Sequence, residues 1–315
     1  MCVVKRQKTG SRYAQNSVTD SDAGTSKHPL MQYFLGIDAG GSHSRARLTN
    51  RDGSVLGEGI SGPANARIGL DSLRAVLMSV TCEAMAAAGL EKRHLPLITA
   101  GMGIAGISRP GMPEAVAELE FPFHAVHLES DAAIANLGAH LGEDGATLVL
   151  GTGSVGYIKV GDTTITIGGY GFPISDEGSG AALGLSAMRH ALRALDGRTK
   201  PTALSAAVTE RFDHDTGRAI TWMDEATPRD YASFAPMIMD YAEKNDEIAR
   251  SIVEDAVKHV EQFIETIFEK GAPRCALAGG LSQRLRPWLR ERTAAKLTDA
   301  KGDSRDGALI LARGE

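Results

Sequence analysis

The sequence contains no apolar run close to the roughly 18 residues that a membrane span needs, and its first residues lack the apolar core of a signal peptide. It holds only three cysteines, Cys2, Cys82 and Cys275, which lie far apart and form no C-x-x-C pair. That spacing fits neither a disulfide framework nor a zinc site. We therefore predict a cytoplasmic protein with no membrane partner.

An excess of positive charge is also missing. Lys and Arg contribute 34 residues and Asp and Glu 39, which gives a formal net charge of −5, and the basic residues are scattered along the chain. A protein that binds nucleic acid usually collects its basic residues on one face or in one stretch. The sequence therefore predicts no nucleic-acid partner.

The chain length predicts more than one domain. Its 315 residues exceed the usual size of a single domain, so two domains are expected, each with a core of its own. Residues 1–30 are rich in Ser, Thr, Lys and Asp and have hardly any periodic apolar positions. Such a composition cannot offset the entropy that is lost on ordering. We predict a disordered tail over residues 1–30.

Two stretches repeat the same order of strand, glycine turn and strand. The first is Tyr33–Asp38, followed by the turn Ala39–His43 and by Arg45–Leu48. The second is Thr147–Val160, with its glycine turn at Gly151–Ser154. Each pattern predicts a β-hairpin, and the repeated order indicates a duplicated domain. Two similar halves that face each other would form a cleft.

Strands and helices alternate along the rest of the chain. Apolar residues recur at helical spacing over Leu70–Ala84, apolar runs at Leu97–Ala100 and Ala125–Leu128 predict buried strands, and Asp246–Lys270 predicts one long helix. This alternation is typical of the α/β class. We place the first domain at residues 31–145, the second at residues 146–304, and a terminal helix that packs back on the first domain at residues 305–315.

Two glycine stretches, Gly101–Gly106 and Gly151–Gly156, match the pattern G-x-G-x-x-G. A dinucleotide fingerprint needs a helix that begins at the last glycine. The first stretch continues into Ser108–Gly111 and the second into residues typical of strands, so neither qualifies. A P-loop needs Lys and then Ser or Thr after its last glycine, where this chain has Tyr157 and Ile158.

The turns at Gly40–Ser42 and Gly151–Ser154 fit another way of binding phosphate. Successive backbone N–H groups of small residues can converge on phosphate oxygens, and one turn from each domain can hold a triphosphate between them. Ordinary hairpin turns also contain glycine, and for either turn alone this alternative stays open. Asp38 and Asp131 lie beside strand ends and favour the functional interpretation.

Three stretches together resemble the motifs of the actin-like ATPase superfamily, which contains hexokinases, actin and heat-shock chaperone ATPases. LGIDAGGSHSRARL (Leu35–Leu48) resembles its first phosphate motif, LVLGTGSVGYI (Leu148–Ile158) its second, and ALAGGLSQRL (Ala276–Leu285) its adenosine motif. The resemblance implies an α/β protein with two actin-like (ribonuclease H-like) ATPase domains around an interdomain cleft, and ATP as cofactor. The implied ATP-binding residues are Gly40, Gly41, Ser42, Gly151, Thr152, Gly153, Ser154, Gly279 and Gly280.

Three further stretches resemble one branch of that superfamily, the N-acetylglucosamine and glucosamine kinases, close to the BadF/BadG/BcrA/BcrD ATPases. They are SGPANARI (Ser61–Ile68), LESDAAIANLGAHL (Leu128–Leu141) and GGYGFPISDEGSGAALG (Gly168–Gly184). The resemblance spans nearly the whole chain after Met31. It implies transfer of the γ-phosphate of ATP to a hydroxyl, at C6, of N-acetylglucosamine or glucosamine.

Two carboxylates receive roles from this resemblance. Asp38 would hold Mg²⁺ through water, as magnesium is usually held in phosphoryl-transfer sites, although a turn-forming Asp is the alternative. Asp131 lies where a strand meets a helix, and the resemblance makes it the catalytic base that orients the sugar hydroxyl and accepts its proton. A helix N-cap is the alternative for Asp131, and both roles can hold together.

The sugar-binding residues that the resemblance implies are Asn65, Asp131, Tyr170 and Asp176. A plain turn at Asn65 and a helix cap at Asp176 remain alternatives. The related pattern has Trp where this chain has Tyr170, and Gly where it has Ser175. These departures leave the identity of the sugar open.

Two other functions compete with the sugar kinase. An ATPase that activates a partner enzyme through a shared iron–sulfur cluster needs a pair of thiolates, and Cys82 in an apolar helix and Cys275 in a core strand do not provide one. A non-catalytic sugar-responsive regulator needs a DNA-binding module, and residues 1–30 are too short for a helix-turn-helix. The preferred sugar, the pathway and the number of subunits, a homodimer included, stay open.

Overall fold

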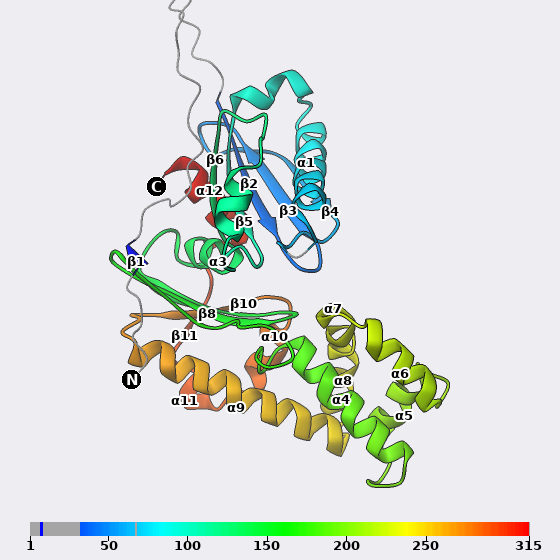
Figure 1. Cartoon of the computed structure of the whole chain (residues 1–315). Coiled ribbons are helices and arrows are strands. Elements are labelled where there is room, and N and C mark those ends of the chain that lie inside the picture. Colours follow the sequence, from blue (N-terminus) through cyan, green and yellow to red (C-terminus); the bar gives the residue numbers. More distant parts are fainter. Residues whose placement is uncertain (1–6, 9–31, 67, 315) are drawn as a thin grey trace, which may run out of the picture. The chain divides into compact units, whose positions relative to one another are not determined.

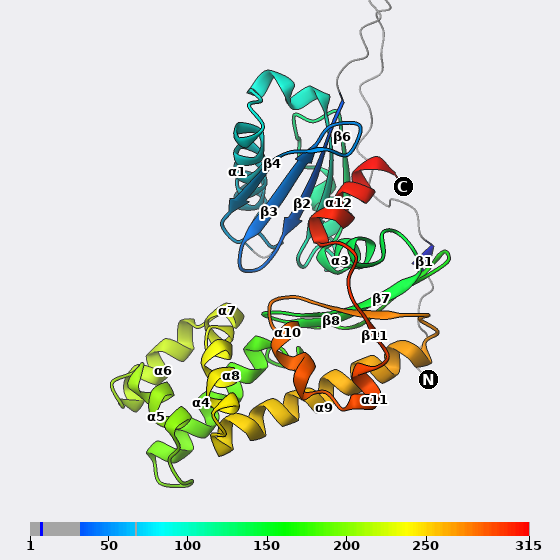
Figure 2. The same ribbon diagram turned by 180° about the vertical axis from the view of Figure 1, so that it is seen from behind.

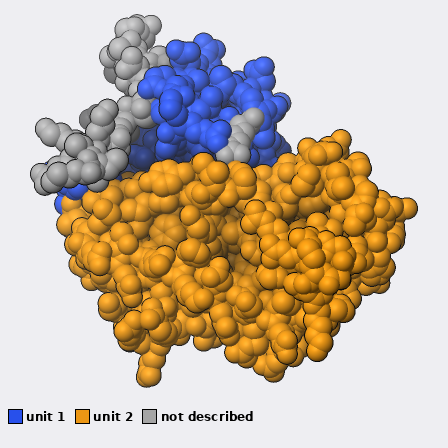
Figure 3. Space-filling model, turned by 60° about the horizontal axis from the view of Figure 1, so that its bottom comes forward, with its two compact units in different colours: residues 1–144, 161–164, 300–315 blue, residues 145–160, 165–299 orange. Residues whose placement is uncertain are grey.

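A computed structural model describes residues 7–8, 32–66 and 68–314 of the chain. The chain divides into two compact units, coloured separately in Figure 3. Unit 1 comprises residues 1–144, 161–164 and 300–315, and unit 2 comprises residues 145–160 and 165–299. Each unit combines a mixed sheet with helices, so the predicted α/β class is confirmed.

Unit 1 is built on a five-stranded sheet in the order β4-β3-β2-β5-β6. Three antiparallel strands are followed by two that run parallel to β2. Its strands and helices are β2 (Tyr33–Ala39), β3 (Ser44–Thr49), β4 (Val55–Ser61), α1 (Leu70–Ala87), β5 (Ile98–Ile104), α2 (Met112–Ala117), β6 (Ala125–Ser130), α3 (Asp131–His140) and α12 (Ser304–Arg313), with a 3-10 turn at Lys92–Leu97.

The two faces of this sheet pack against different helices, because successive side chains of a strand point to opposite faces. On β4, Gly57 and Gly59 lie against the backbone of α1. Glu58, which lies between them, forms ion pairs instead with Arg47 of β3 and Arg305 of α12. The result is a layer of α1, a sheet, and a layer that contains α12 (Figures 1 and 2).

Helix α12 packs into unit 1 with its backbone close to other backbones. Gly36 of β2 and Gly101 of β5 face the backbone of α12 so closely that a side chain on either glycine would collide with it. Gly307 of α12 and Gly138 of α3 make the corresponding close approach between those two helices. These contacts also explain why Gly101 is glycine without any role in binding a dinucleotide.

Unit 2 repeats the strand order of unit 1. Its sheet has the order β9-β8-β7-β10-β11, extended by β1 to six strands, and β10 lies parallel to both β7 and β11. The elements are β7 (Gly145–Leu150), β8 (Ser154–Val160), β9 (Thr163–Gly168), α4 (Gly180–Leu195), α5 (Ala203–Glu210), α6 (Thr216–Glu225), α7 (Pro228–Ala232), α8 (Ala235–Glu243), α9 (Glu247–Glu269), β10 (Cys275–Ala278), α10 (Ser282–Leu285), a 3-10 turn at Arg286–Trp288, α11 (Glu291–Ala294) and β11 (Leu297–Thr298).

The predicted long helix is α9, which Asp246 caps by accepting hydrogen bonds from the N–H groups of Ile248 and Ala249. Its buried stripe packs into one core with residues from α4, α5, α8 and the sheet. Figure 1 shows α9 running beneath the sheet of unit 2 and on to the helices α4 to α8. Across the described ranges, none of the helices is both long and apolar enough to cross a membrane.

Gln7 and Lys8 differ from the prediction of a disordered tail over residues 1–30. They form β1 and pair antiparallel with Thr163 and Thr164 of β9. A strand at the edge of a sheet presents unpaired N–H and C=O groups, which accept a further strand of almost any sequence. The other residues of the predicted tail lie outside the described residues.

Candidate active site

In unit 1, the parallel strands β2, β5 and β6 end level with one another. Ala39 of β2 pairs with Ile104 of β5, and Ile104 pairs with Ser130 of β6. Ligands of open α/β sheets usually bind outside these carboxyl ends. Asp38 and Asp131 therefore belong to the same edge of the sheet, with one strand between them.

Asp131 is the first residue of α3, and it is not the cap of that helix. The cap is Ser130, whose Oγ accepts a hydrogen bond of 3.1 Å from the N–H of Ala133. The capping alternative for Asp131 is therefore wrong by one residue. Asp131 Oδ1 accepts a hydrogen bond of 3.0 Å from the N–H of its neighbour Ala132.

The environment of Asp131 changes its acidity. Burial and the nearby negative charge of Asp38 raise the pKa of the Asp131 carboxyl from 3.8 to about 6. Burial raises it because a low-dielectric surrounding disfavours the charged form. At neutral pH the group is still mostly ionised, and its pKa lies close to the value that best suits a general base.

Asp38 is 9% exposed at the end of β2 and pairs with a cation across the hairpin. The Nη2 atom of Arg45, its partner on β3, lies 2.7 Å from Asp38 Oδ2. A single carboxylate fits Mg²⁺ in a phosphoryl-transfer site, where the ion keeps several waters and takes its other oxygens from phosphates. The position of Asp38 directly before the first glycine turn agrees with that use.

The first turn connects Asn65 to the same edge. The N–H of Gly40 closes the turn on the carbonyl of His43 at 3.2 Å, and the carbonyl of Gly40 accepts from the N–H of Ala64 at 3.0 Å. Asn65 itself forms an isolated parallel bridge with Ala105, just beyond the end of β5. Unit 1 thus brings Asp38, Gly40, Asn65 and Asp131 to one edge of its sheet.

The second turn and the predicted adenosine motif meet in unit 2. The N–H of Gly151 bonds to the carbonyl of Gly153 at 2.9 Å, which closes the turn between β7 and β8. Strand β10 runs parallel to β7, and beyond its end Gly279, at φ 90°, lies against the backbone of Leu150. The N–H of Leu281 bonds to the carbonyl of Leu150 at 3.0 Å, so Gly279 and Gly280 lie beside the second turn.

The two predicted sugar residues of unit 2 differ in exposure. Asp176 is 8% exposed, and its Oδ1 accepts a hydrogen bond of 3.4 Å from the N–H of Ser154 in the second turn. Tyr170 is 77% exposed and lies between Gly169 and Gly171, which both have positive φ. The cap of the following helix α4 is Ser179, so the capping alternative for Asp176 is wrong as well.

Some glycines of the predicted site have no structural reason to be glycine. A side chain on Gly41, Gly151 or Gly280 would meet nothing within 4 Å, and none of the three has a positive φ. The same holds for Gly62, which lies in the stretch Ser61–Ile68 together with Asn65. Glycine is also selected where a ligand must approach the backbone closely. Open space beside each of the three nucleotide turns fits that explanation.

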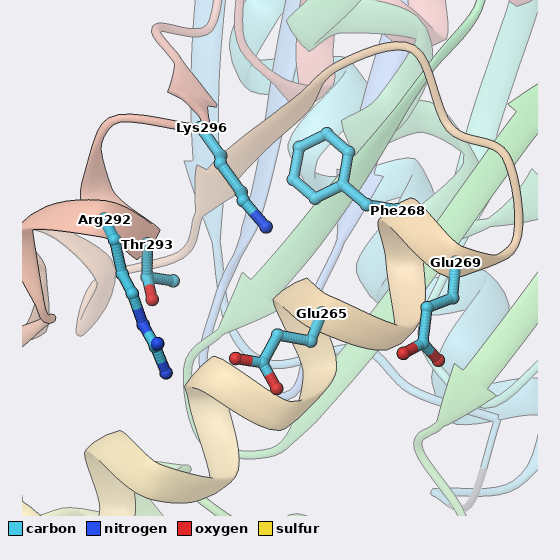
Figure 4. A pocket seen from close by; sticks show the side chains of 6 residues that line it. All are labelled: Glu265, Phe268, Glu269, Arg292, Thr293 and Lys296. Carbon is cyan, nitrogen blue, oxygen red and sulfur yellow. The ribbon is translucent and has the colours of Figure 1, made fainter.

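Unit 2 also has a surface pocket that contains none of the predicted site residues. Figure 4 shows that its side chains come from α9, α11 and the segment that follows α11. Its lining mixes acidic and basic residues and includes no residue of the predicted site. The lining residues are Glu265, Phe268, Glu269, Arg292, Thr293 and Lys296.

Sequence reasoning missed two features of this site. It considered Asp131 as the alternative cap of α3 and did not consider Ser130, which is equally typical of a cap and precedes Asp131 by one residue. It also missed Arg45 as the partner of Asp38. The alternation of β3 could have indicated this pair, because residues of a hairpin that are equally far from its turn face each other.

Two mixed sheets of the same strand order, each with a glycine turn after its central strand, define the actin-like ATPase fold. Solved structures agree with this class. A Chromobacterium violaceum protein, provisionally named an N-acetylglucosamine kinase, superposes with a TM-score of 0.85 at 30% identity, covering 90% of this chain and 100% of that one. A glucokinase of the ROK family from Streptomyces griseus has a TM-score of 0.54 at 17% identity, covers 89% and 98% of the two chains, and supports the fold alone.

The sequence profile of the BadF/BadG/BcrA/BcrD ATPase family matches residues 35–312, and the chain belongs to this family. Among similar proteins is the glucosamine kinase GspK of Vibrio cholerae. It is 36% identical over 283 residues, which cover 90% of this chain and 96% of that protein. The N-acetylmuramic acid/N-acetylglucosamine kinase of Clostridium acetobutylicum is 25% identical over 307 residues, with 90% and 99% coverage.

Proposed function

We propose that the protein is an ATP-dependent kinase that transfers the γ-phosphate to a hydroxyl, at C6, of glucosamine or N-acetylglucosamine. The observation that carries the proposal is the carboxyl group of Asp131. Burial and Asp38 raise its pKa to about 6, and Ser130 rather than Asp131 caps the helix. The similarity to a glucosamine kinase over 90% of the chain supplies the class of acceptor.

The reaction needs a base, phosphate ligands and an acceptor. In our proposal the Asp131 carboxylate accepts the proton of the sugar hydroxyl while the hydroxyl oxygen bonds to the γ-phosphorus and the bond to the β-phosphate oxygen breaks. ADP and the sugar phosphate are the products. The turns at Gly40–Ser42 and Gly151–Ser154 would bind the phosphates, and Gly279 and Gly280 would border the adenosine.

We propose Mg²⁺ as the metal and Asp38 as the residue that holds it, through water. Bound there, the ion would neutralise charge on the phosphates. Arg45, which now pairs with Asp38 at 2.7 Å, balances the charge of the carboxylate. Asp38→Asn should raise the Mg²⁺ concentration that gives half-maximal turnover, measured by Mg²⁺ titration at fixed ATP.

We propose Asn65, Asp131, Tyr170 and Asp176 as the sugar-binding residues. Asn65 and Asp131 lie at the same sheet edge of unit 1. Tyr170 is 77% exposed, lies just beyond the end of β9, and has an aromatic ring that can stack on a sugar ring. A polar group that pairs with a substrate hydroxyl discriminates strongly against analogues that lack it, because the group is then left unsatisfied.

The two competing functions gain no support. An iron–sulfur ATPase needs thiolates, but Cys275 is fully buried in β10, where burial raises its pKa to about 12. The other described cysteine, Cys82, lies on α1 in unit 1. The curated relatives are named as kinases of amino sugars. We place the reaction in the cytoplasm and leave open whether the chain forms a homodimer.

A coupled assay for ADP release tests the proposal. Wild-type protein with ATP and Mg²⁺ should turn over with glucosamine or N-acetylglucosamine and much more slowly with N-acetylmannosamine or glucose. Asp131→Asn is the matched control, because it keeps the size of the side chain. Equal ATP hydrolysis with and without every sugar would reject the kinase and favour an ATPase that serves another partner.

A further inference from the structure

The segment Asp176–Ala181, which follows Tyr170 in the predicted sugar-binding stretch Gly168–Gly184, lies directly against the second glycine turn, and both belong to unit 2. Four hydrogen bonds join them. The N–H groups of Gly180 and Ala181 donate to the carbonyls of Gly151 (2.8 Å) and Thr152 (3.1 Å). Ser154 completes the set, since its Oγ donates to the carbonyl of Glu177 at 2.8 Å and its N–H donates to Asp176 Oδ1 at 3.4 Å.

These bonds leave the turn with a supported side and an open side. A side chain on Gly153 would meet the carboxylate of Asp176 at 3.0 Å. On Gly151 a side chain would meet nothing within 4 Å. The carboxylate therefore supports the turn from the side of Gly153, while the space beside Gly151 remains for a ligand.

The backbone of Asp176 is itself in an uncommon conformation. Its φ is 69°, in the left-handed region that non-glycine residues occupy at a cost of about 1–2 kcal/mol. Such conformations persist where the surrounding structure fixes them, and they gather at functional sites. Here the conformation directs a carboxylate that is 8% exposed towards the N–H of Ser154.

We propose that Asp176 is a positioning residue that fixes the backbone of Gly153 and Ser154 so that the turn can bind the phosphates of ATP. Because Asp176 also belongs to the predicted sugar-binding residues, a sugar bound to it would act on the same support of the turn. The proposal rests on the proposed function, since it assumes that this turn binds ATP. It gives Asp176 a role towards the nucleotide besides the hydroxyl contact expected from its family.

Two substitutions separate these roles. Asp176→Gly removes the carboxylate and tolerates the positive φ, whereas Asp176→Asn keeps an oxygen that can accept from the N–H of Ser154. Calorimetric titration with a non-hydrolysable ATP analogue and Mg²⁺, without sugar, measures the effect on the nucleotide. We expect the Kd to rise about 10-fold for Asp176→Gly and less than about 3-fold for Asp176→Asn, since the loss of one hydrogen bond is of this size.

Ser175→Ala is the matched control, because the Ser175 hydroxyl bonds to the Glu177 carboxylate and not to the turn. It should leave the Kd of the analogue within about 2-fold, well below the effect expected for Asp176→Gly. Melting temperatures identify any misfolded variant, and Asp176→Ala, which also lacks the carboxylate but is strained at φ 69°, then replaces Asp176→Gly. If Asp176→Asn keeps the affinity for the analogue that Asp176→Gly loses, the cause is the missing oxygen atom and not a general loss of structure.

Two outcomes would overturn the proposal. If Asp176→Gly binds the analogue as wild type does and loses only sugar affinity, Asp176 serves the sugar alone. If it binds the analogue more tightly, the carboxylate occupies an anion position on the turn and competes with phosphate. Failure of the proposed function is distinguishable, because a wild-type protein that binds the analogue but phosphorylates no amino sugar would leave this measurement intact.

Discussion

The two glycine turns lie at equivalent places in sheets of the same strand order, but their surroundings differ. The turn at Gly40–His43 in unit 1 has two carboxylates at its sheet edge, Asp38 and Asp131. The turn at Gly151–Ser154 in unit 2 is bonded to the segment Asp176–Ala181, which begins α4. In the proposed mechanism the repeated strand order serves two purposes: unit 1 would supply the reactive groups, and unit 2 would supply a turn that is held by hydrogen bonds to the start of α4.

The largest expected effect tests the chemical half of this comparison. Asp131→Asn should lower turnover by roughly 10²–10⁴-fold, the usual contribution of a general base, and leave the Kd of an ATP analogue unchanged. A carboxyl whose pKa is raised to about 6 in the folded protein contributes stability at low pH and loses it as the pH rises through 6. The melting temperature of the variant at pH 8 should therefore not fall. Near wild-type turnover would remove Asp131 from the mechanism.

The next prediction concerns the glycines that face open space. Gly41→Ala and Gly151→Ala should fold normally and weaken binding of an ATP analogue, by on the order of 10-fold, which corresponds to about 1.4 kcal/mol. The loss should be greater at Gly151, because its turn is bonded to α4 and cannot move away. Gly101→Ala is the control, since its methyl group would strike the carbonyl of Ala308. It should lower stability by about 1–3 kcal/mol or more instead. Unchanged affinity in both turn variants would contradict the phosphate assignment.

A smaller effect should appear in the pH profile. If the carboxylate form of Asp131 is the base, as proposed, kcat/KM should fall by about tenfold for each pH unit below the pKa of this carboxyl, which is about 6 before Mg²⁺ binds at Asp38. The profile is measured with the preferred amino sugar at saturating ATP and Mg²⁺. A plateau that extends down to pH 4.5 would mean that no group of this pKa controls the reaction.

The smallest expected effect should be equal in the two units. Ser130 caps α3 in unit 1 and Ser179 caps α4 in unit 2, each through a bond from the residue three positions on. Ser130→Ala and Ser179→Ala should each cost about 1 kcal/mol, measured by denaturant unfolding. A much larger loss for Ser179→Ala would show that the second turn and its helix carry more of the stability than this comparison assigns to them.

Local patterns predicted the elements well. The hairpin strands β2 and β3 and the long helix α9 follow from periodicity and turn residues that lie close together in sequence. Strand β4 was missed, because Gly57 and Gly59 weaken its pattern. Those glycines are there to let α1 approach, and this is a tertiary cause that periodicity does not contain.

The site was predicted less completely, because its decisive contacts join distant residues. The types of residue in the motifs pointed to Asp131 and Asp38, and their common edge follows from the strand order. The bond between Asp176 and Ser154 spans 22 positions and depends on the left-handed backbone of Asp176. Asp tolerates that conformation but does not require it, so its sequence gives no sign of it.

The packing of α12 has a consequence for synthesis on the ribosome. Gly36 and Gly101 belong to strands made early, and the helix that covers their backbones is made only after all of unit 2. Until then the centre of the first sheet remains open on one face while unit 2 emerges and folds. Unit 1 can therefore complete its packing only after α12, at the end of the chain, has been synthesised. Contacts between residues so far apart in sequence slow folding.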